Sequence, residues 1–271
     1  MNASRIGAEG ATFAYGRRTV ATDLTVRVPD GSFTVIVGPN ACGKSTLLRA
    51  LARLLAPRPG TVLLDGRDIS SYPSKAVARV VGLLPQSSTA PDGITVADLV
   101  AHGRYPHQSL LRQWSDDDER AVAEAMALTH TTDLADRYVD ELSGGQRQRV
   151  WIAVALAQET PILLLDEPTT FLDIAHQVEV MELCRDLHAR GRTLVVVLHD
   201  LNQSCRYASH LIAMKDGRVV AQGSPADIVT TELVREVFGL DSTILADPYS
   251  GTPLVVPAPA PVPAEPLVHK A

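Results

Sequence analysis

"GPNACGKST" (residues 38–46) decides the fold, because it lies between the two patterns of one strand–helix unit. Before it, "SFTVIV" (residues 32–37) is short and rich in β-branched side chains, which predicts a buried strand. After it, leucines recur at helical spacing from Leu47 to Leu55, which predicts a helix that "PRPG" (residues 57–60) ends. A glycine-rich loop between a strand and a helix is typical of phosphate binding.

The residue types of this loop fit phosphate chemistry. Gly38, Gly43, Lys44 and Ser45 satisfy the pattern G-x-x-x-x-G-K-[ST]. Backbone amides of such a loop surround phosphates, the lysine balances charge on the β and γ groups, and the serine hydroxyl reaches magnesium. A structural turn without a ligand is the alternative. We expect a nucleotide to bind the whole loop, which consists of Gly38, Pro39, Asn40, Ala41, Cys42, Gly43, Lys44, Ser45 and Thr46.

Polar residues end three further apolar runs. In "ILLLDE" (residues 162–167), Asp166 can hold magnesium, and Glu167 can orient or deprotonate an attacking water. His199 ends the run "TLVVVLHD", where it either reaches a γ-phosphate or serves as a structural residue. Gln86 follows "VVGLLP" and is either a surface amide or a ligand to water and metal. Position alone leaves both alternatives open for His199 and Gln86.

Strands that alternate with helices predict an α/β fold with a mostly parallel sheet covered on both faces. Residues 87–158 differ, because they show no convincing strand and contain a helix opened by "SDDDER" (residues 115–120), where a serine cap precedes carboxylates. "GSPADIV" (residues 223–229) predicts a late helix with a serine cap and proline at its first position. We expect a core formed by residues 1–86 and 159–256, a helical insertion at 87–158, and a proline-rich disordered tail at 257–271.

Composition excludes several classes of protein. The 45% apolar and 21% charged fractions are those of a globular protein. Acidic residues outnumber basic ones by 31 to 25, so the chain lacks the diffuse positive charge of a nucleic-acid binder. The apolar runs are too short for a membrane span, the N-terminus has no signal-peptide core, and the three cysteines are widely spaced. We therefore expect the protein to lie in the reducing cytoplasm.

"LSGGQRQR" (residues 142–149) is a second candidate anion cradle, since a serine and two glycines precede the helical pattern "VWIAVALA". Its place after the phosphate loop and Gln86, and before "ILLLDEPTTFLD" and His199, covers most of the chain. In this order the motifs resemble the ATP-binding subunits of ABC transporters, with "LSGGQ" as the family signature. The resemblance implies a P-loop NTPase (RecA-like) core, a small N-terminal antiparallel β region and a helical signature subdomain.

The resemblance also implies roles for single residues. Tyr15 would stack on adenine, and Gln86 would link the nucleotide and its metal to a membrane subunit. Glu167 would be the catalytic base, and His199 would sense the γ-phosphate. Asp173 would meet a partner.

The residue types at two positions of the phosphate loop can be compared with the family pattern. Ala41 stands where the family more often has glycine, a small change unless the backbone there needs a positive φ. Cys42 is either a compact filler or a redox-active thiol.

The family further implies an assembly. Two such domains meet head to tail, and the signature of one chain closes over the ATP that the phosphate loop of the other holds. The residues concerned are Ser143, Gly144, Gly145 and Gln146. Their amides at a helix start would favour the γ-phosphate. A capped helix turn without a ligand is the alternative.

Three segments of the sequence indicate which group of ABC transporters the chain resembles. "GITVADLVAHGRYPHQ" (residues 93–108) and the segments at 112–129 and 166–188 are similar to ATPases of ferric-siderophore importers, with cobalamin and haem importers as close relatives. This similarity implies a magnesium-dependent ATPase on the cytoplasmic face of the membrane. Its partners would be a second ATPase subunit, permease subunits and a substrate-binding protein. The histidines at 102 and 107 match no standard metal-ligand spacing, so we expect them to be solvated or to face the permease.

Two further alternatives belong to other classes. A soluble ABC protein of DNA repair or of ribosomes usually has two modules, long insertions or basic surfaces, whereas this chain has one module, no zinc-type cysteine spacing and a net charge of -6. A regulatory partner that binds ATP without turnover would not need Glu167 and His199.

Overall fold

A six-stranded sheet forms the centre of the protein, which a computed structural model describes for residues 4–86, 89–108 and 114–259. Its strand order is β10-β9-β3-β8-β7-β6, and only β10 is antiparallel to its neighbour. The bounds are β3 (Phe33–Val37), β6 (Val81–Leu84), β7 (Ile162–Asp166), β8 (Thr193–Val197), β9 (His210–Lys215) and β10 (Arg218–Gly223). The predicted α/β class with a mostly parallel sheet is confirmed.

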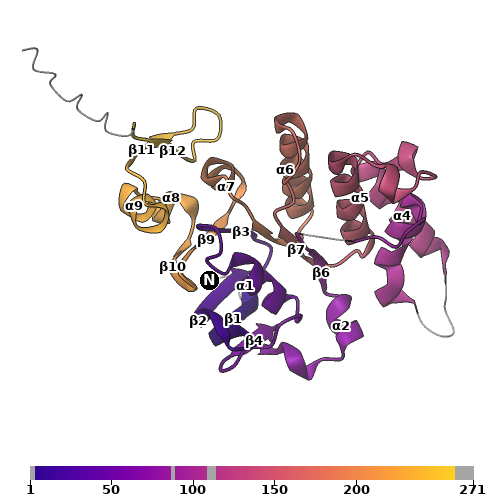
Figure 1. The fold of residues 1–271 in the computed structure, drawn as a ribbon, viewed down its shortest axis with the longest axis horizontal. Coiled ribbons are helices and arrows are strands. Elements are labelled where there is room, and N and C mark those ends of the chain that lie inside the picture. The colour runs from indigo at the N-terminus through magenta and orange to yellow at the C-terminus, as the bar shows by residue number, and fades with distance from the viewer. Residues whose placement is uncertain (1–3, 87–88, 109–113, 260–271) are drawn as a thin grey trace, which may run out of the picture.

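A second, antiparallel sheet is built from the N-terminal segment. Its order is β2-β1-β4-β5, with β1 (Ser4–Tyr15), β2 (Arg18–Pro29), β4 (Thr61–Leu64) and β5 (Arg67–Asp68). Helix α1 (Lys44–Leu51) packs in one apolar cluster with both sheets, and Figure 1 shows it above β1 and β4. The expected small antiparallel region therefore covers one face of the central sheet through α1.

Side chains of β3 alternate between the two faces, as the geometry of a strand requires. Ile36 joins the cluster with α1, whereas Val35 and Val37 join a second cluster on the other face. Helices in that second cluster include α5 (Gly144–Ala157), α6 (Ile174–Ala189), α7 (Leu201–Tyr207) and α9 (Thr231–Phe238). Both faces of the sheet are thus buried.

Helix α1 ends four residues earlier than the leucine pattern predicts. Arg53 has a φ of 60°, and its amide donates to Ala50 O (2.9 Å) while the Leu54 amide donates to Arg49 O (2.8 Å). These two bonds are those of a Schellman C-cap, which closes a helix with a left-handed residue. Leu54 is consequently 61% exposed, and the prediction that the helix continues to Leu55 is wrong.

Helices occupy the segment between β6 and β7, at one end of the molecule (Figure 1). Ser115 forms a capping box with Asp118 at the start of α4, so the predicted serine cap is confirmed. In the described parts of residues 87–158 we find an isolated bridge between Thr95 and Tyr138 but no strand. The helices are α3 (Val96–Ala101) and α4 (Asp116–Leu128), followed by α5, with 3-10 turns at His102–His107, Thr132–Leu134 and Val139–Glu141. The exact domain boundaries remain a prediction.

A hairpin of β11 (Ser242–Ala246) and β12 (Pro253–Pro257) completes the described chain. The helix α8 (Pro225–Ile228) precedes it with the predicted Ser224 cap and proline at its start. Pro257 pairs with Ser242, and the Ala258 amide donates to Asp241 O (2.7 Å). The hairpin therefore includes the first residues of the predicted disordered tail, and residues 260–271 lie outside the described residues. The remaining short elements are α2 (Ser74–Ala78) and a 3-10 turn at Ile69–Ser71.

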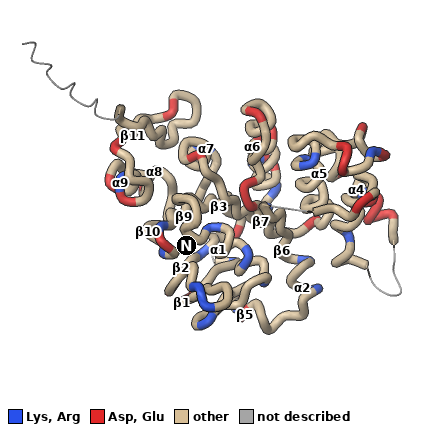
Figure 2. The backbone as a smooth tube through the Cα atoms, in the orientation of Figure 1, with Lys and Arg blue, Asp and Glu red and all other residues tan. Residues whose placement is uncertain are grey.

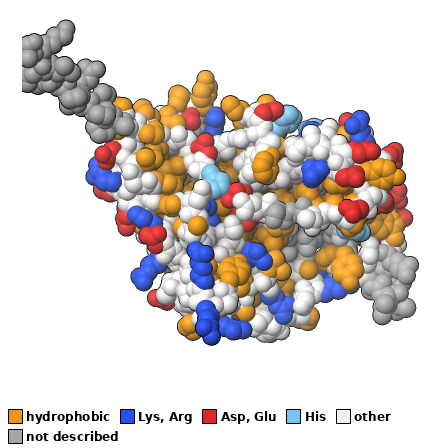
Figure 3. Space-filling model, in the orientation of Figure 1, with side chains coloured by type: hydrophobic (Ala, Val, Ile, Leu, Met, Phe, Trp, Pro, Cys, Tyr) orange, Lys and Arg blue, Asp and Glu red, His pale blue; other side chains and the backbone are white. Residues whose placement is uncertain are grey.

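The charged groups are unevenly spread over the fold. Figure 2 shows basic residues around β1, α1 and α2, and acidic residues at the start of α4. On the face drawn in Figure 3, apolar side chains lie among charged ones. None of the described helices combines the length and the apolar character needed to cross a membrane.

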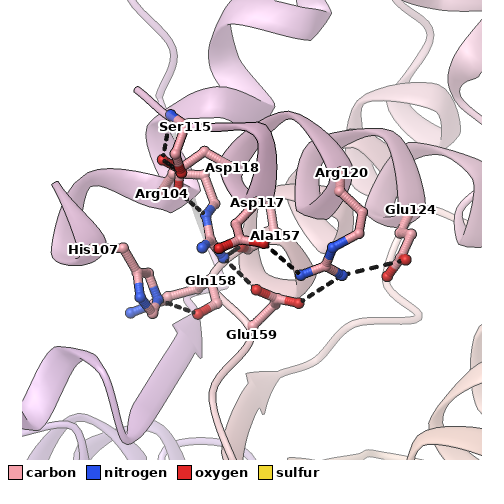
Figure 4. Close-up of polar contacts among 10 residues, drawn as sticks. All are labelled: Arg104, His107, Ser115, Asp117, Asp118, Arg120, Glu124, Ala157, Gln158 and Glu159. Carbon is pink, nitrogen blue, oxygen red and sulfur yellow. Dashed lines mark hydrogen bonds and ion pairs between the residues drawn. The ribbon is translucent and has the colours of Figure 1, made fainter. Parts of the chain in front are cut away.

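A buried ion pair fastens the helical region together (Figure 4). Arg104 Nε lies 2.8 Å from Asp118 Oδ1, and both side chains are 4% exposed. Arg104 Nη1 also donates to Ala157 O (2.7 Å) and to Glu159 Oε2 (2.8 Å). Burial opposes ionisation of Asp118, but hydrogen bonds from Arg104 and Ser115 outweigh it and hold the pKa of this carboxyl below its ordinary value. One guanidinium thus joins the start of α4 to the end of α5.

Replacing Arg104 by methionine should leave the Asp118 carboxylate buried without its cation. We expect the free energy of unfolding to fall by about 3 kcal/mol, measured by urea unfolding at neutral pH. Arg120→Met is the matched control, because Arg120 pairs with Glu124 and Glu159 but its side chain is 51% exposed. Its effect should be much smaller, because solvent screens an exposed ion pair. Equal losses in the two variants would contradict the importance of burial for the Arg104 pair.

Candidate functional site: a phosphate cleft

The loop between β3 and α1 holds a buried ammonium group. Lys44 is 5% exposed, and its Nζ donates to Gly38 O (2.8 Å) and Pro39 O (2.9 Å). An ammonium group has three donors, so these two bonds leave one for a ligand. Gly38 has a φ of 150°, and a Cβ atom there would overlap the carbonyl oxygen of Met214. Glycine is therefore required for the loop to pass this close to β9.

Ala41 is the position at which this loop departs from the family pattern, and Cys42 follows it. Ala41 has a φ of 62°, the left-handed conformation in which a Cβ atom costs about 1 kcal/mol. Its side chain is exposed, so the cost arises within its own backbone rather than from a neighbour. Cys42 is 4% exposed, and burial raises the pKa of its thiol. A protonated, buried thiol is inert, which fits the filler interpretation of Cys42.

Ser45 and Asp166 form a pair of oxygen donors next to this loop. Ser45 Oγ donates to Asp166 Oδ1 at 3.0 Å. Asp166 is 4% exposed, and burial raises the pKa of its carboxyl, with the hydrogen bond from Ser45 acting in the opposite direction. Magnesium prefers oxygen ligands and is commonly held by one or two protein groups together with substrate phosphates. The residues present therefore fit a magnesium ion bound with a nucleotide.

Glu167 contacts polar side chains that follow the two strands on either side of its own strand. Its Oε2 accepts from Gln86 Nε2 (2.9 Å), and its Oε1 lies 2.7 Å from His199 Nε2. Gln86 follows β6, Glu167 follows β7 and His199 follows β8. Thr170 Oγ1 is a weaker donor to the same carboxylate at 3.4 Å. Glu167 has a φ of 54°, a strained conformation of the kind that collects at functional sites.

A cleft of about 580 Å³ opens beside these groups, and Asp166 does not itself line it. It is lined by Arg18, Val20, Asn40, Ala41, Gly43, Lys44, Ser45, Thr46, Gln86, Glu167 and His199. Sequence reasoning missed Arg18 and Val20, which enter from β2. A basic residue three positions after Tyr15 could have indicated Arg18, whereas no local signal points to Val20. The two residues bring the N-terminal sheet to the phosphate loop.

Tyr15 does not line this cleft. Its ring is 42% exposed, and the Arg49 guanidinium lies 5.8 Å from its centroid. Contact with adenine therefore stays a prediction.

The signature residues also lie apart from the cleft within one chain. Ser143 caps α5, where its Oγ accepts from the Gln146 amide (3.3 Å) and Gln146 Oε1 accepts from the Ser143 amide (3.1 Å). Gly144 and Gly145 lie instead against Phe171 and Leu172. The chain thus does not place its own signature over its own phosphate loop.

Asp173 caps α6 outside the cleft. It accepts from the His176 amide (2.9 Å), and this bond holds the pKa of its carboxyl below the ordinary value. The structure accordingly places the phosphate loop and the three strand ends together, but not Tyr15, Asp173 or the signature.

Comparison with known proteins agrees with this arrangement. The family model described as ABC transporter matches residues 21–170. The ferric enterobactin transport ATP-binding protein of Escherichia coli (strain K12) is 59% identical over 255 residues, which cover 94% of each chain. The hemin import ATP-binding protein of Rhodococcus jostii (strain RHA1) is 42% identical over 250 residues, covering 92% of this chain and 85% of that one.

Solved structures show the same fold. A metal-chelate-type ABC transporter in an inward-facing conformation matches with a TM-score of 0.79 and 30% identity, over 95% of this chain and 98% of that one. A dimeric bacterial ABC transporter cassette matches with a TM-score of 0.73 and 27% identity, over 81% of this chain and 98% of that one. The chain belongs to the ABC transporter family, as one of its ATP-binding and ATP-hydrolysing subunits.

Proposed function

We propose that this chain energises the import of a ferric siderophore through a partner membrane permease, by hydrolysing ATP in the phosphate cleft. The observation that carries the hydrolytic role is the placement of Glu167 between Gln86 and His199, beside the phosphate loop. The identity to the ferric enterobactin relative, which exceeds that to the hemin relative, supports the siderophore as cargo.

Different residues of the chain have different roles in the proposed hydrolysis. Lys44 and the loop amides would bind the phosphates, and Ser45, Asp166 and Gln86 would hold magnesium, which would neutralise phosphate charge. Glu167 accepts the proton of the attacking water, and its fixed carboxylate orients that water. His199 lines the same cleft within hydrogen-bond distance of Glu167 and would contact the γ-phosphate.

Completion of the site requires a second ATPase subunit. Ser143 and Gln146 form the capping box at the start of α5, away from their own cleft. The amides of Gly144 and Gly145 take no part in that box and are available to the nucleotide of a partner. Asp173 would meet the same partner, and Tyr15 would receive the adenine. An identical chain is the simplest partner, since the motifs needed on both sides are present once in each copy.

The rest of the proposed assembly follows from the importer relatives. The chain would dock on the cytoplasmic face of the membrane against permease subunits, and a substrate-binding protein would deliver the chelate. Cobalamin and haem are the alternative cargoes. A soluble ABC protein acting on nucleic acid is less favoured, because the net charge is -6.

Glu167→Gln should separate ATP binding from ATP hydrolysis. We expect turnover to fall by about 10²- to 10⁴-fold, because the amide cannot accept the proton of water. ATP binding and ATP-dependent dimerisation should persist, measured by equilibrium nucleotide binding and by light scattering coupled to gel filtration. Ser143→Ala in the Glu167→Gln background should weaken the dimer without weakening ATP binding by the monomer. Full turnover in Glu167→Gln would remove Glu167 as the base.

Asp166→Asn should stabilise the nucleotide-free chain while abolishing magnesium-dependent turnover. Burial raises the pKa of this carboxyl above 3.8, so its contribution to stability falls as pH rises from 3.8 through the folded value. We expect a higher unfolding temperature than wild type at neutral pH, and a difference that shrinks as pH approaches about 4. Asp68→Asn is the control, because a hydrogen bond from Ser70 lowers the pKa of that carboxyl. Stabilisation by Asp68→Asn and not by Asp166→Asn would reverse the expected sign.

The cargo is tested by uptake in cells that lack this gene. We expect loss of labelled ferric siderophore uptake and retention of cobalamin and haem uptake. Wild-type chain supplied in trans should restore uptake, whereas the Glu167→Gln chain should not, because the permease needs hydrolysis. Loss of cobalamin uptake alone would overturn the siderophore assignment.

A further inference from the structure

The short helix α7, which directly follows His199 and Asp200, depends on anchors outside itself. A helix of seven residues is too short to be stable alone. Asp200 caps it by accepting from the Gln203 amide (2.9 Å), and its own residues Ser204 and Cys205 are buried. The His199 side chain is 48% exposed, so burial does not fix its ring. On one side of His199, the Leu198 amide donates to Ile36 O (3.3 Å) and holds the chain to the sheet. On the other side, the position of His199 depends on the first turn of α7.

Asn202 anchors this turn to the C-terminal hairpin. Asn202 Oδ1 accepts from the Val255 amide (2.7 Å), and Asn202 Nδ2 donates to Val255 O (3.2 Å). Val255 lies on β12, is 7% exposed and packs in the same apolar cluster as Cys205. Figure 1 shows β12 next to α7. The amide side chain thus bonds Val255 as a neighbouring strand would, which requires both a donor and an acceptor.

Gln203 anchors the same turn on the other side. Its Nε2 donates to Gln177 Oε1 (3.2 Å), and Gln177 Nε2 donates to Leu172 O (3.0 Å). Leu172 lies in the loop that leads from Glu167 to α6. A chain of hydrogen bonds therefore connects the first turn of α7 to the loop after Glu167. The hairpin, α7 and this loop thus form one hydrogen-bonded network that adjoins both His199 and Glu167.

We propose that Asn202 is a positioning residue for ATP hydrolysis, which keeps His199 within hydrogen-bond distance of Glu167 by fastening α7 to the C-terminal hairpin. The inference rests on the proposed role of His199 in hydrolysis. None of the hairpin residues lines the described cleft, so the hairpin acts on the reaction through α7 alone. The hairpin therefore stabilises the site through its contact with α7.

The test is a double-mutant cycle in the full chain, with steady-state ATP hydrolysis and equilibrium ATP binding as readouts. Asn202→Ala should lower kcat about tenfold, the effect of losing one or two hydrogen bonds that hold a reacting group. The dissociation constant for ATP should stay unchanged, because the phosphate loop keeps its own contacts. In a His199→Ala background, Asn202→Ala should lower kcat no further. A general structural role would instead lower kcat by the same factor in both backgrounds.

Gln222→Ala is the matched control. The Gln222 side chain also bonds backbone at two points, accepting from the Arg27 amide (3.3 Å) and donating to Thr25 O (3.4 Å), but it joins β10 to β2. It should leave kcat unchanged. Asn202→Asp keeps the acceptor for the Val255 amide and should lose less activity than Asn202→Ala, and it replaces the alanine variant in the cycle if that variant unfolds.

Each failure has a different meaning. Unchanged kcat in Asn202→Ala, or multiplicative losses in the cycle, would overturn the positioning role while leaving His199 in the mechanism. Full turnover in His199→Ala would remove His199 from the proposed mechanism, and the positioning role of Asn202 with it.

Discussion

The register of β3, β8 and β7 is the constraint on which the cleft depends. Ile36 pairs with Val197, and Val197 pairs with Asp166, so the three strands end on one line. The phosphate loop, the two acids and His199 all leave the sheet from that line. A shift of one residue would turn Asp166 to the opposite face of the sheet. The 3.0 Å contact between Ser45 and Asp166 is therefore set by backbone pairing, between strands separated by β8.

Charges in the cleft are held close together because each has its own hydrogen-bond partners. Carbonyl oxygens of the loop satisfy Lys44, Ser45 satisfies Asp166, and Gln86 with His199 satisfies Glu167. Burying such groups without partners would cost several kcal/mol each. The same partners are the residues that would contact the nucleotide and its metal, so one set of side chains both stabilises the buried charges and builds the reactive site.

The local predictions succeeded where the signal was local. The Ser115 and Ser224 caps were predictable because a capping side chain bonds an amide three residues away. The end of α1 was not, since a left-handed arginine at position 53 carries no compositional signal. Ala41 illustrates an intermediate case, because the family pattern indicated where a positive φ would matter, and only the backbone showed that the chain adopts it.

The sequence by itself determined the α/β class, the phosphate chemistry of residues 38–46 and the order of motifs that marks the family, because these depend on periodicity and on residue types close along the chain. The tertiary structure decided which motifs share a cleft. It brought Arg18 to the phosphate loop, kept Ser143 away from it and fastened Val255 to Asn202. Such contacts join residues far apart in the chain. They follow from strand order and packing, and short sequence patterns do not predict either.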